Sequence, residues 1–280
     1  MNYLSEMDSS APDFGDFYDE LPLWSAPFGL MLLDQVPLKP GISILDVGAG
    51  TGFASLELAQ RCGPTSTVIA VDPWQPVVAR LRRKLQHLGL INVRVLEQDA
   101  AALDLPAESI DLVVSNLGIN NFADPEAVLK TCWRVMKPGA GIVLTTNLEG
   151  HMQEFYEIYR QTLIALGFTD RLEAFEKHIH HRATIDSVTQ LLIRADFDLV
   201  EVTRSAFRMR FADGSSLLRH HFIRFGFLPA WKEVVQPADI EMTFSELEKQ
   251  LNEAALASGE LSLTIPMACI AARKPGVHSA

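Results

Sequence analysis

The chain has 280 residues, of which 48% are hydrophobic and 21% are charged, a composition typical of a globular protein with a full apolar core. Its formal net charge of -11 argues against nucleic acid as a partner, because an acidic surface repels phosphate backbones. Three scattered cysteines, Cys62, Cys132 and Cys269, lack metal-ligand spacing, so we expect no metal site and a reducing, cytoplasmic environment.

The N-terminal region shows no pattern of a leader or a membrane span. No Lys or Arg precedes Lys39, whereas a signal peptide starts with basic residues and an apolar run. No apolar stretch in the chain is long enough for stable membrane insertion. Residues 1–13 are polar and are expected to be loose, and the aromatic residues 14–34 predict one or two short helices.

Residues 42–147 alternate between short apolar runs and amphipathic segments, which predicts a parallel sheet with right-handed helical crossovers. The apolar runs are continuous rather than alternating, as in strands that are covered on both faces. Gly89 ends one expected helix, and Asp124-Pro125 begins another that ends at Lys137-Pro138-Gly139. The expected strands are 42–47, 67–72, 93–98, 110–116 and 141–147.

The second half of the chain predicts further helices, mixed with two strands. One helix is expected to begin at the capping box Thr243-Phe244-Ser245-Glu246 and to end near Gly259. The other predicted helices are 151–166, 171–181, 187–195 and 215–225, and the predicted strands are 197–210 and 262–271. A basic stretch, Arg80 to Lys84, has helical spacing and indicates a solvated helix face.

A glycine-rich loop, Asp46-Val47-Gly48-Ala49-Gly50-Thr51-Gly52, separates the first expected strand from the first helix. Glycines at this place let a ligand approach the backbone closely. A nicotinamide dehydrogenase would need G-x-G-x-x-G, and its last glycine is replaced by Phe53. Asp46 is poorly placed for a pyrophosphate and better placed for an ammonium group, such as that of S-adenosyl-L-methionine.

The loop resembles the first motif, acid-x-G-x-G-x-G, of class I S-adenosylmethionine-dependent methyltransferases. Asp72, Asp99, Asn116-Leu117-Gly118 and Met136-Lys137-Pro138-Gly139 match later segments of that family in the same order. The resemblance implies S-adenosyl-L-methionine as the cofactor. The cofactor-binding residues that it implies are Tyr18, Asp46, Gly48, Ala49, Gly50, Gly52, Asp72, Pro73, Trp74, Asp99, Ala100 and Asn116.

The resemblance also implies a role for several of these residues. Asp72 would bind the ribose hydroxyls and Asp99 the adenine amino group, with Pro73-Trp74 as an apolar wall. Tyr18 or Trp24 would lie near the cofactor in an N-terminal lid. Each has a simpler alternative: Asp72 as a helix cap, Asp99 as an ordinary loop acid, Trp74 and the N-terminal aromatic residues as core, and Asn116 as a turn residue.

The family has a Rossmann-like, doubly wound α/β sheet of seven strands in the order 3-2-1-4-5-7-6, with the last strand antiparallel. Within the family, residues 116–122 resemble the ubiquinone/menaquinone-biosynthesis C-methyltransferases. The predicted division is an N-terminal lid, a cofactor-binding core, two helical cap insertions separated by a core helix and strand, and a final strand with a tail. Their ranges are, in that order, 1–40, 41–147, 148–185, 186–210, 211–258 and 259–280.

Four histidines are candidate general bases: His178, His181, His220 and His221. A metal site there would also need a carboxylate and supporting residues, which the sequence does not indicate, so a metal is not expected. The aromatic residues of the insertions predict a cap over the acceptor. They are Phe155, Tyr156, Tyr159, Phe222, Phe225, Phe227 and Trp231.

These features together predict methyl transfer to a small, fairly apolar acceptor by in-line displacement. The family's enzymes that methylate adenine or glutamine amino groups carry a [D/N]-P-P-[F/Y] motif after the fourth strand. This chain lacks it and reads Asn116-Leu117-Gly118-Ile119 there. Two alternatives stay open: C-methylation of a quinone precursor, and cofactor binding without catalysis. The acceptor atom, the base and a homodimeric state are left open by the sequence.

Overall fold

The computed structural model describes residues 3–19, 23–180 and 182–276, and these divide into two compact units. The core unit consists of the described residues within 10–147, 183–205 and 267–280. The helical unit consists of those within 1–9, 148–182 and 206–266. No helix in the described ranges is long and apolar enough to cross a membrane.

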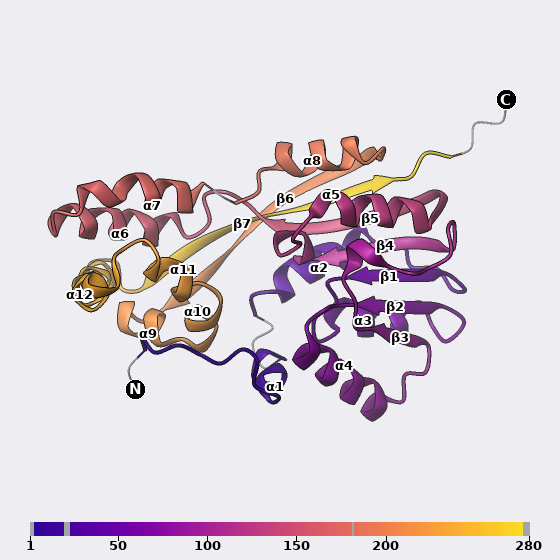
Figure 1. Ribbon diagram of the computed structural model, residues 1–280, viewed down its shortest axis with the longest axis horizontal. Coiled ribbons are helices and arrows are strands. Elements are labelled where there is room, and N and C mark those ends of the chain that lie inside the picture. Colours follow the sequence, from indigo (N-terminus) through magenta and orange to yellow (C-terminus); the bar gives the residue numbers. More distant parts are fainter. Residues whose placement is uncertain (1–2, 20–22, 181, 277–280) are drawn as a thin grey trace. The chain divides into compact units, whose positions relative to one another are not determined.

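The sheet has seven strands in the order β3-β2-β1-β4-β5-β7-β6, which confirms the predicted fold (Figure 1). Strands β1 to β5 pair in parallel, and β7 pairs with β5 in the antiparallel direction. Two of the boundaries between the units, at 205/206 and 266/267, fall within β6 and β7. The strands are β1 Ser43–Val47, β2 Thr67–Val71, β3 Val93–Leu96, β4 Ile110–Asn116, β5 Met136–Asn147, β6 Asp198–Phe211 and β7 Leu261–Arg273.

The middle strands are buried along almost their whole length, because helices cover the sheet of the core unit. Leu45 of β1 is aligned with Ile69 of β2 and Val113 of β4, and none of the three is more than 9% exposed. Helix α2 contacts β4 and β5, α3 contacts β2, and α4 contacts β3. The helices of this unit are α1 Phe14–Asp19, α2 Ala26–Gln35, α3 Phe53–Arg61, α4 Gln75–Leu88, α5 Pro125–Val135 and α8 Ile185–Arg194, with the short 3-10 helices η1 Ala100–Ala102 and η2 Gly118–Asn120.

Two predicted helix boundaries in the core unit are confirmed. Gly89 has φ +65° and ends α4, a conformation that glycine adopts without steric cost. The Asp124 side chain accepts a hydrogen bond from the Ala127 amide and so caps α5, with Pro125 in the first position.

The predicted Lys137-Pro138-Gly139 turn at the end of α5 is wrong. Helix α5 ends at Val135, and Met136–Asn147 forms a single strand. The β4–β5 register shifts between Ile110 and Leu112, and Gly139 has φ +80° and donates its amide to the Lys274 carbonyl. The sequence Lys-Pro-Gly is therefore accommodated as an irregularity in the strand, which tertiary pairing with the chain end stabilises.

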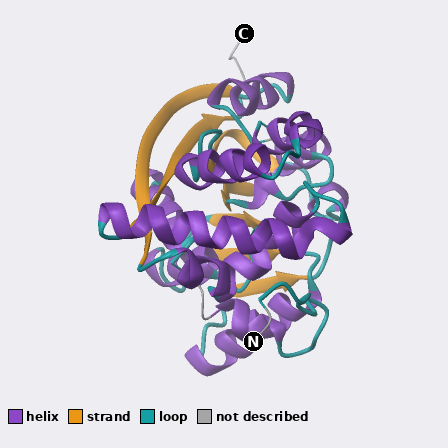
Figure 2. Cartoon of the chain, turned by 90° about the vertical axis from the view of Figure 1, so that its left-hand side faces the viewer, coloured by secondary structure: helices purple, strands orange, loops and turns teal. Residues whose placement is uncertain are grey.

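The helical unit contains α6 Gln153–Ala165, η3 Thr169–Arg171, α7 Leu172–Ile179, α9 Gly214–Arg219, α10 His221–Gly226, α11 Leu228–Lys232, η4 Pro237–Asp239 and α12 Ile240–Ser258. Helices and strands are distinguished by colour in Figure 2. Phe155, Tyr159, Phe175, Trp231 and Phe244 are each 0% exposed. Several aromatic residues that the sequence suggested as a cap therefore form the unit's own core.

The predicted capping box at Thr243 is also wrong. Helix α12 begins at Ile240, directly after the 3-10 turn Pro237–Asp239, so Thr243 lies inside the helix and is fully buried. Pro237 fixes a φ angle that suits a helical turn, which allows the helix to begin earlier than the capping residues suggest.

The N-terminal residues are more ordered than their polar composition indicated. The Tyr3 ring is 8% exposed, and its hydroxyl donates a hydrogen bond of 3.3 Å to the Phe244 carbonyl. The Arg219 guanidinium lies 4.7 Å from the centre of that ring. This aromatic side chain helps to attach residues 3–9 to the rest of the helical unit, so the expectation that the N-terminal residues are loose is wrong for this part of the segment.

Candidate functional site

The glycine loop after β1 is a backbone cradle in the core unit. The Gly48 and Ala49 amides both donate to the Val71 carbonyl, at 2.9 and 3.0 Å, so the loop turns over the end of β2. Gly52 has φ +92°, and a Cβ there would lie 2.3 Å from a Leu81 methyl group. Since Gly48 and Gly50 also have positive φ, the three glycines are needed for this conformation. Of the three positions, only the place of a Cβ on Gly50 has no atom nearer than 4.0 Å, so the loop is open to a ligand at Gly50.

Asp72, which follows β2, holds this loop from the side. Its Oδ2 accepts a hydrogen bond of 2.9 Å from the Gly50 amide, and its Oδ1 accepts one of 2.9 Å from the Trp74 amide. Burial raises the pKa of this carboxyl group, while the two backbone donors oppose that rise. A carboxylate oxygen can accept more than one hydrogen bond, so both oxygens keep acceptor capacity for the hydroxyls of a ribose.

Tyr18 of α1 is brought next to the loop, as the family resemblance implied for a residue of the lid. A ring carbon of Tyr18 lies 4.0 Å from the place that a Cβ of Gly50 would occupy. Its ring packs edge-on against Trp74, with 5.5 Å between ring centres, and Phe14 packs 5.4 Å from the same indole. Burial raises the pKa of Tyr18, and the negative charge of Asp72 adds to this effect. Pro73 is exposed beside them.

Helix α1 is attached to α4 by ion pairs, a feature that the sequence did not reveal. Asp19 lies 2.9 Å from Arg80 and 2.8 Å from Lys84, and Asp16 pairs with Arg80 and Arg83. The basic stretch is therefore not simply a solvated face: most of it binds an acidic helix. The sequence signal for these ion pairs was an acidic segment at residues 16–19 and a basic segment at residues 80–84. Only the fold brings the two segments together.

Asp46 lies beneath the loop rather than at its surface. It is 1% exposed, and its Oδ2 accepts a hydrogen bond of 2.5 Å from the Ser55 hydroxyl of α3. Burial raises its pKa to about 6, although the Ser55 hydrogen bond opposes that shift. Ser55 is a site residue that the sequence analysis missed, and the signal was a polar side chain within the apolar stripe of α3.

The loop after β3 carries the predicted adenine-binding residues. The Asp99 Oδ1 accepts a hydrogen bond of 2.9 Å from the Ala101 amide and caps η1, whereas Ala100 is 6% exposed. Asp99 itself is exposed, so its second oxygen can receive a ligand donor. Its binding to adenine stays a prediction.

The loop after β4 packs directly against the glycine loop. A Cβ on Gly48 would lie 3.0 Å from the Gly118 Cα, and a Cβ on Gly118 would lie 2.7 Å from the Val47 carbonyl oxygen. Strands β1 and β4 are neighbours at the point where the strand order reverses. Ligands of open α/β sheets bind at such a switch point, outside the carboxyl ends of the strands.

Asn116 ends β4 and is fixed by two hydrogen bonds. Its Oδ1 accepts one of 2.7 Å from the Thr145 hydroxyl, and its Nδ2 donates one of 3.2 Å to the Ser25 carbonyl. The next residue, Leu117, has φ +65°, and its amide donates to Thr145. A non-glycine residue in this region stores backbone strain, which is common at ligand sites. Thr145 was not identified from the sequence.

The described candidate bases, His178, His220 and His221, belong to the helical unit. His178 Nε2 lies 3.4 Å from the Tyr156 hydroxyl, and burial lowers the pKa of His220 and His221. His181 lies outside the described residues. Among the described residues, no group of three or more His, Cys, Asp or Glu side chains is arranged to hold a metal.

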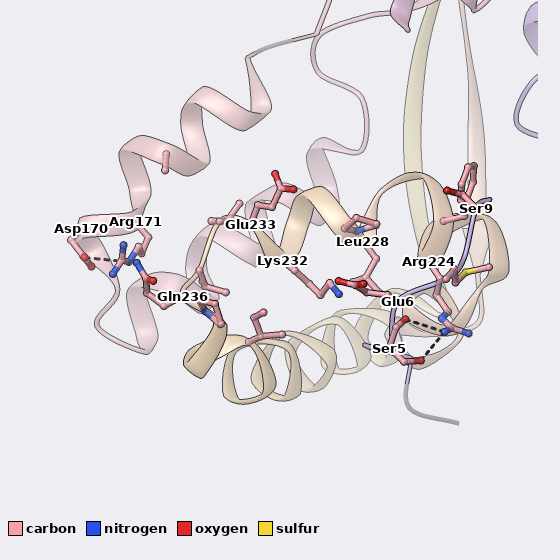
Figure 3. A pocket seen from close by; sticks show the side chains of 18 residues that line it. Ser5, Glu6, Ser9, Asp170, Arg171, Arg224, Leu228, Lys232, Glu233 and Gln236 are labelled. Atoms are coloured by element: carbon pink, nitrogen blue, oxygen red, sulfur yellow. Dashed lines mark hydrogen bonds and ion pairs between the residues drawn. The ribbon is translucent and has the colours of Figure 1, made fainter. Parts of the chain in front are cut away.

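A separate cavity of about 830 Å³ lies within the helical unit (Figure 3). Its volume is in the range of small-molecule sites. Its lining includes Phe225 and Leu228, together with Ser5, Glu6, Met7 and Ser9 of the N-terminal segment. Two cations in its wall hold this segment, because Arg224 donates to the Ser5 carbonyl and Lys232 donates to the Leu4 carbonyl.

Comparisons with known proteins identify the domain family of the core unit. Residues 44–139 match the methyltransferase domain family. The chain is 27% identical over 175 residues to a ubiquinone/menaquinone biosynthesis C-methyltransferase of Shewanella sp. (strain W3-18-1), covering 59% of this chain and 70% of that protein. It is 35% identical over 119 residues to nocamycin O-methyltransferase of Saccharothrix syringae, covering 42% of each.

The fold is also similar to that of solved structures. The YcgJ protein of Bacillus subtilis superposes with a TM-score of 0.58 and 18% identity, covering 89% of this chain and 98% of that one. The sheet order, the glycine cradle and the matched domain point to one family. The chain is a class I S-adenosylmethionine-dependent methyltransferase.

Proposed function

We propose that this methyltransferase acts on a small, fairly apolar molecule and that its cofactor lies in the cradle formed after β1 and β4. The observation that carries this proposal is the direct packing of the two loops at the switch point, with a Gly118 Cα 3.0 Å from the place of a Gly48 Cβ. No side chain can fill that place, and the acidic and aromatic groups around it suit a cation with an adenosine group.

In this proposal, different residues of the core unit bind different parts of the cofactor. The loop from Gly48 to Gly52 lies under the methionyl part, Asp72 binds the ribose hydroxyls, and Asp99 binds the adenine amino group. The cofactor supplies an electrophilic methyl group on a sulfonium cation. The chain orients the two reactants in line and excludes water, which accounts for much of the catalysis of such displacements.

The acceptor is proposed to be held by the helical unit. Most of its aromatic residues pack in its own core, so in this proposal the acceptor contacts the edge of that core and the polar groups beside it. For a phenol or carbon acid, a base must remove a proton, and the Tyr156–His178 pair is the best candidate because the two groups are 3.4 Å apart.

C-methylation of a quinone precursor is the second candidate. The similarity to a ubiquinone/menaquinone biosynthesis C-methyltransferase over 175 residues favours it. The shorter match to an O-methyltransferase, at 35% identity, favours an oxygen acceptor instead.

One experiment tests the proposal and separates these candidates. The protein is incubated with S-adenosylmethionine labelled in the methyl group and with a small-molecule extract of its own host, and labelled products are identified by mass spectrometry. We expect one labelled small molecule, whose fragmentation shows whether carbon or oxygen was methylated. No labelled product in a preparation that binds S-adenosylhomocysteine would instead favour a cofactor-binding protein without catalysis.

A further inference from the structure

Arg182, in the helical unit, is a cation with no anionic partner among the described residues. In the described part of the chain no carboxylate lies within ion-pair distance of it, and its buried Nε has no hydrogen-bond partner. Three other arginines, Arg94, Arg204 and Arg208, also have no hydrogen bond or ion pair to the described residues, but these three are exposed to water. Arg182 is partly buried. A cation removed from water normally pairs with an anion, so an unpaired Arg182 suggests that the anion is supplied by a ligand.

The surroundings of Arg182 are aromatic. Its guanidinium carbon lies 5.9 Å from the centre of the Phe227 ring, and Phe227 is 5% exposed. Burial lowers the pKa of Arg182, and the nearby Tyr156 hydroxyl opposes that effect. Arginine nevertheless stays protonated in proteins, so the positive charge persists against this apolar wall.

Tyr156 adds a polar group to the same cluster. Its hydroxyl oxygen accepts a hydrogen bond of 3.2 Å from the Trp231 indole and lies 3.4 Å from the His178 Nε2. The His151 ring packs edge-on against Tyr156, with 5.6 Å between ring centres. The cluster therefore combines flat apolar surfaces, a fixed hydroxyl and one uncompensated positive charge.

The cations of the neighbouring cavity differ from Arg182 in this respect. Arg224 and Lys232 donate to backbone carbonyls of residues 3–5, so they hold the N-terminal segment in place (Figure 3). No backbone carbonyl of the described residues receives a hydrogen bond from Arg182. Of the cations in this unit, Arg182 is thus the best suited to an external anion.

We propose that Arg182 binds a carboxylate on the methyl acceptor, with the flat apolar part of the acceptor against Phe227 and Tyr156. This inference rests on the proposed function and adds a substrate class, flat apolar carboxylic acids. The planar guanidinium presents parallel N–H groups that match the two oxygens of a carboxylate, and a ring face beside it suits an aromatic or otherwise flat molecule.

The probes that test this site are 2-naphthoate and its neutral amide, 2-naphthamide, with saturating S-adenosylhomocysteine present. Their affinities are measured by titration for the full-length protein, Arg182→Gln and Arg208→Gln, the last being an exposed arginine of the same unit. We expect the unmodified protein and Arg208→Gln to prefer the carboxylate by about tenfold or more, the scale of a charged hydrogen bond. We expect Arg182→Gln to bind both probes alike.

The location of the probe is read from the Trp231 indole N–H resonance, which is assigned by its loss in Trp231→Phe. It should move on addition of 2-naphthoate in the unmodified protein and not in Arg182→Gln. Equal affinity for both probes in the unmodified protein, or a carboxylate preference that survives in Arg182→Gln, would overturn the inference. If Arg182→Gln does not fold, Arg182→Lys, which keeps the charge but lacks the planar fork, should show a reduced preference; an undiminished preference again overturns it.

Failure of this inference is distinguishable from failure of the proposed function. A labelled methyl product without a carboxylate, formed equally well by Arg182→Gln, would refute the Arg182 site and leave methyl transfer intact. Carboxylate selectivity that depends on Arg182, in a protein that labels no acceptor, would refute the transfer reaction alone.

Discussion

Asp46 couples the stability of the core unit to pH. Its pKa is raised by burial from 3.8 to about 6, so the folded chain holds this proton more tightly than the unfolded chain does. Its contribution to stability is therefore fully present below about pH 4 and is lost as pH rises through about pH 6, by roughly 3 kcal/mol. The Ser55 hydrogen bond limits this loss because it favours the ionised carboxylate.

We expect Asp46→Asn to remove this part of the pH dependence, because an amide does not ionise in this range. The measurement is the free energy of unfolding by urea at several values between pH 4 and pH 7, compared between the two proteins. Their difference should change with pH in the stated direction; a constant difference would show that Asp46 does not titrate in this window. If the carboxylate also binds the ammonium of the cofactor, affinity for S-adenosylhomocysteine should increase with pH across the same range in the unmodified protein.

Asp72 has a structural and a proposed binding role, and the two can be separated. Asp72→Ala removes the acceptor of the Gly50 and Trp74 amides and, by our proposal, the ribose contacts. We expect affinity for S-adenosylhomocysteine to fall by about 1–3 kcal/mol, the scale for unpairing hydrogen bonds to a charged group. Calorimetry on a folded variant measures this change, and Asp72→Asn serves as the control that keeps one acceptor oxygen. An unchanged affinity in Asp72→Ala would place the ribose elsewhere.

At the scale of elements, α1 depends on α4 for its position. Asp19 is 14% exposed and pairs with Arg80 and Lys84, which are 29% and 24% exposed, so these pairs are less screened than ordinary surface pairs. A Cβ on Gly15 would lie 2.2 Å from the Pro76 carbonyl oxygen, which shows how closely the two helices approach. Both charge and shape therefore position Tyr18 beside the loop.

We expect Asp19→Asn to loosen α1, with faster amide hydrogen exchange over residues 14–19 and several-fold weaker binding of S-adenosylhomocysteine. The loss of these pairs should amount to about 1 kcal/mol. Glu97→Gln is the matched control, because Glu97 pairs with Arg82 of the same helix at an exposed position and does not contact α1 in any described pair. Similar exchange in both variants would mean that apolar packing alone holds α1.

The elements of the core were largely predictable because their local signals agree with the fold. Continuous apolar runs predicted β1, β2 and β4, and capping chemistry at Asp124 and Gly89 predicted the helix ends. The failures, at Lys137-Pro138-Gly139 and at Thr243, arose where another local signal or a tertiary contact overrode the motif. Strand pairing determined the first, and the preceding proline turn and burial determined the second.

At the scale of the whole molecule, the two units carry different kinds of functional groups. The core unit holds the glycine cradle and the acids around it, whereas the helical unit holds the candidate bases and Arg182. The cofactor class follows from the first unit, because its loop geometry suits few ligands. By our proposal the helical unit binds the acceptor, so Arg182 is the more informative residue for the substrate class.

The sequence predicted a parallel α/β sheet from its apolar periodicity, and its resemblance to a known family implied the full fold, the cofactor and the catalytic class, because the glycines and strand-end acids stand in a fixed order along the chain. It did not reveal that Asp19 pairs with Arg80, that Ser55 binds Asp46, or that Arg182 lies against Phe227 with no acid beside it in the part of the chain that the structure describes. Each of these interactions joins residues that lie in different helices, strands or loops. Burial and charge pairing are properties of the packed state, so only the tertiary structure decided them.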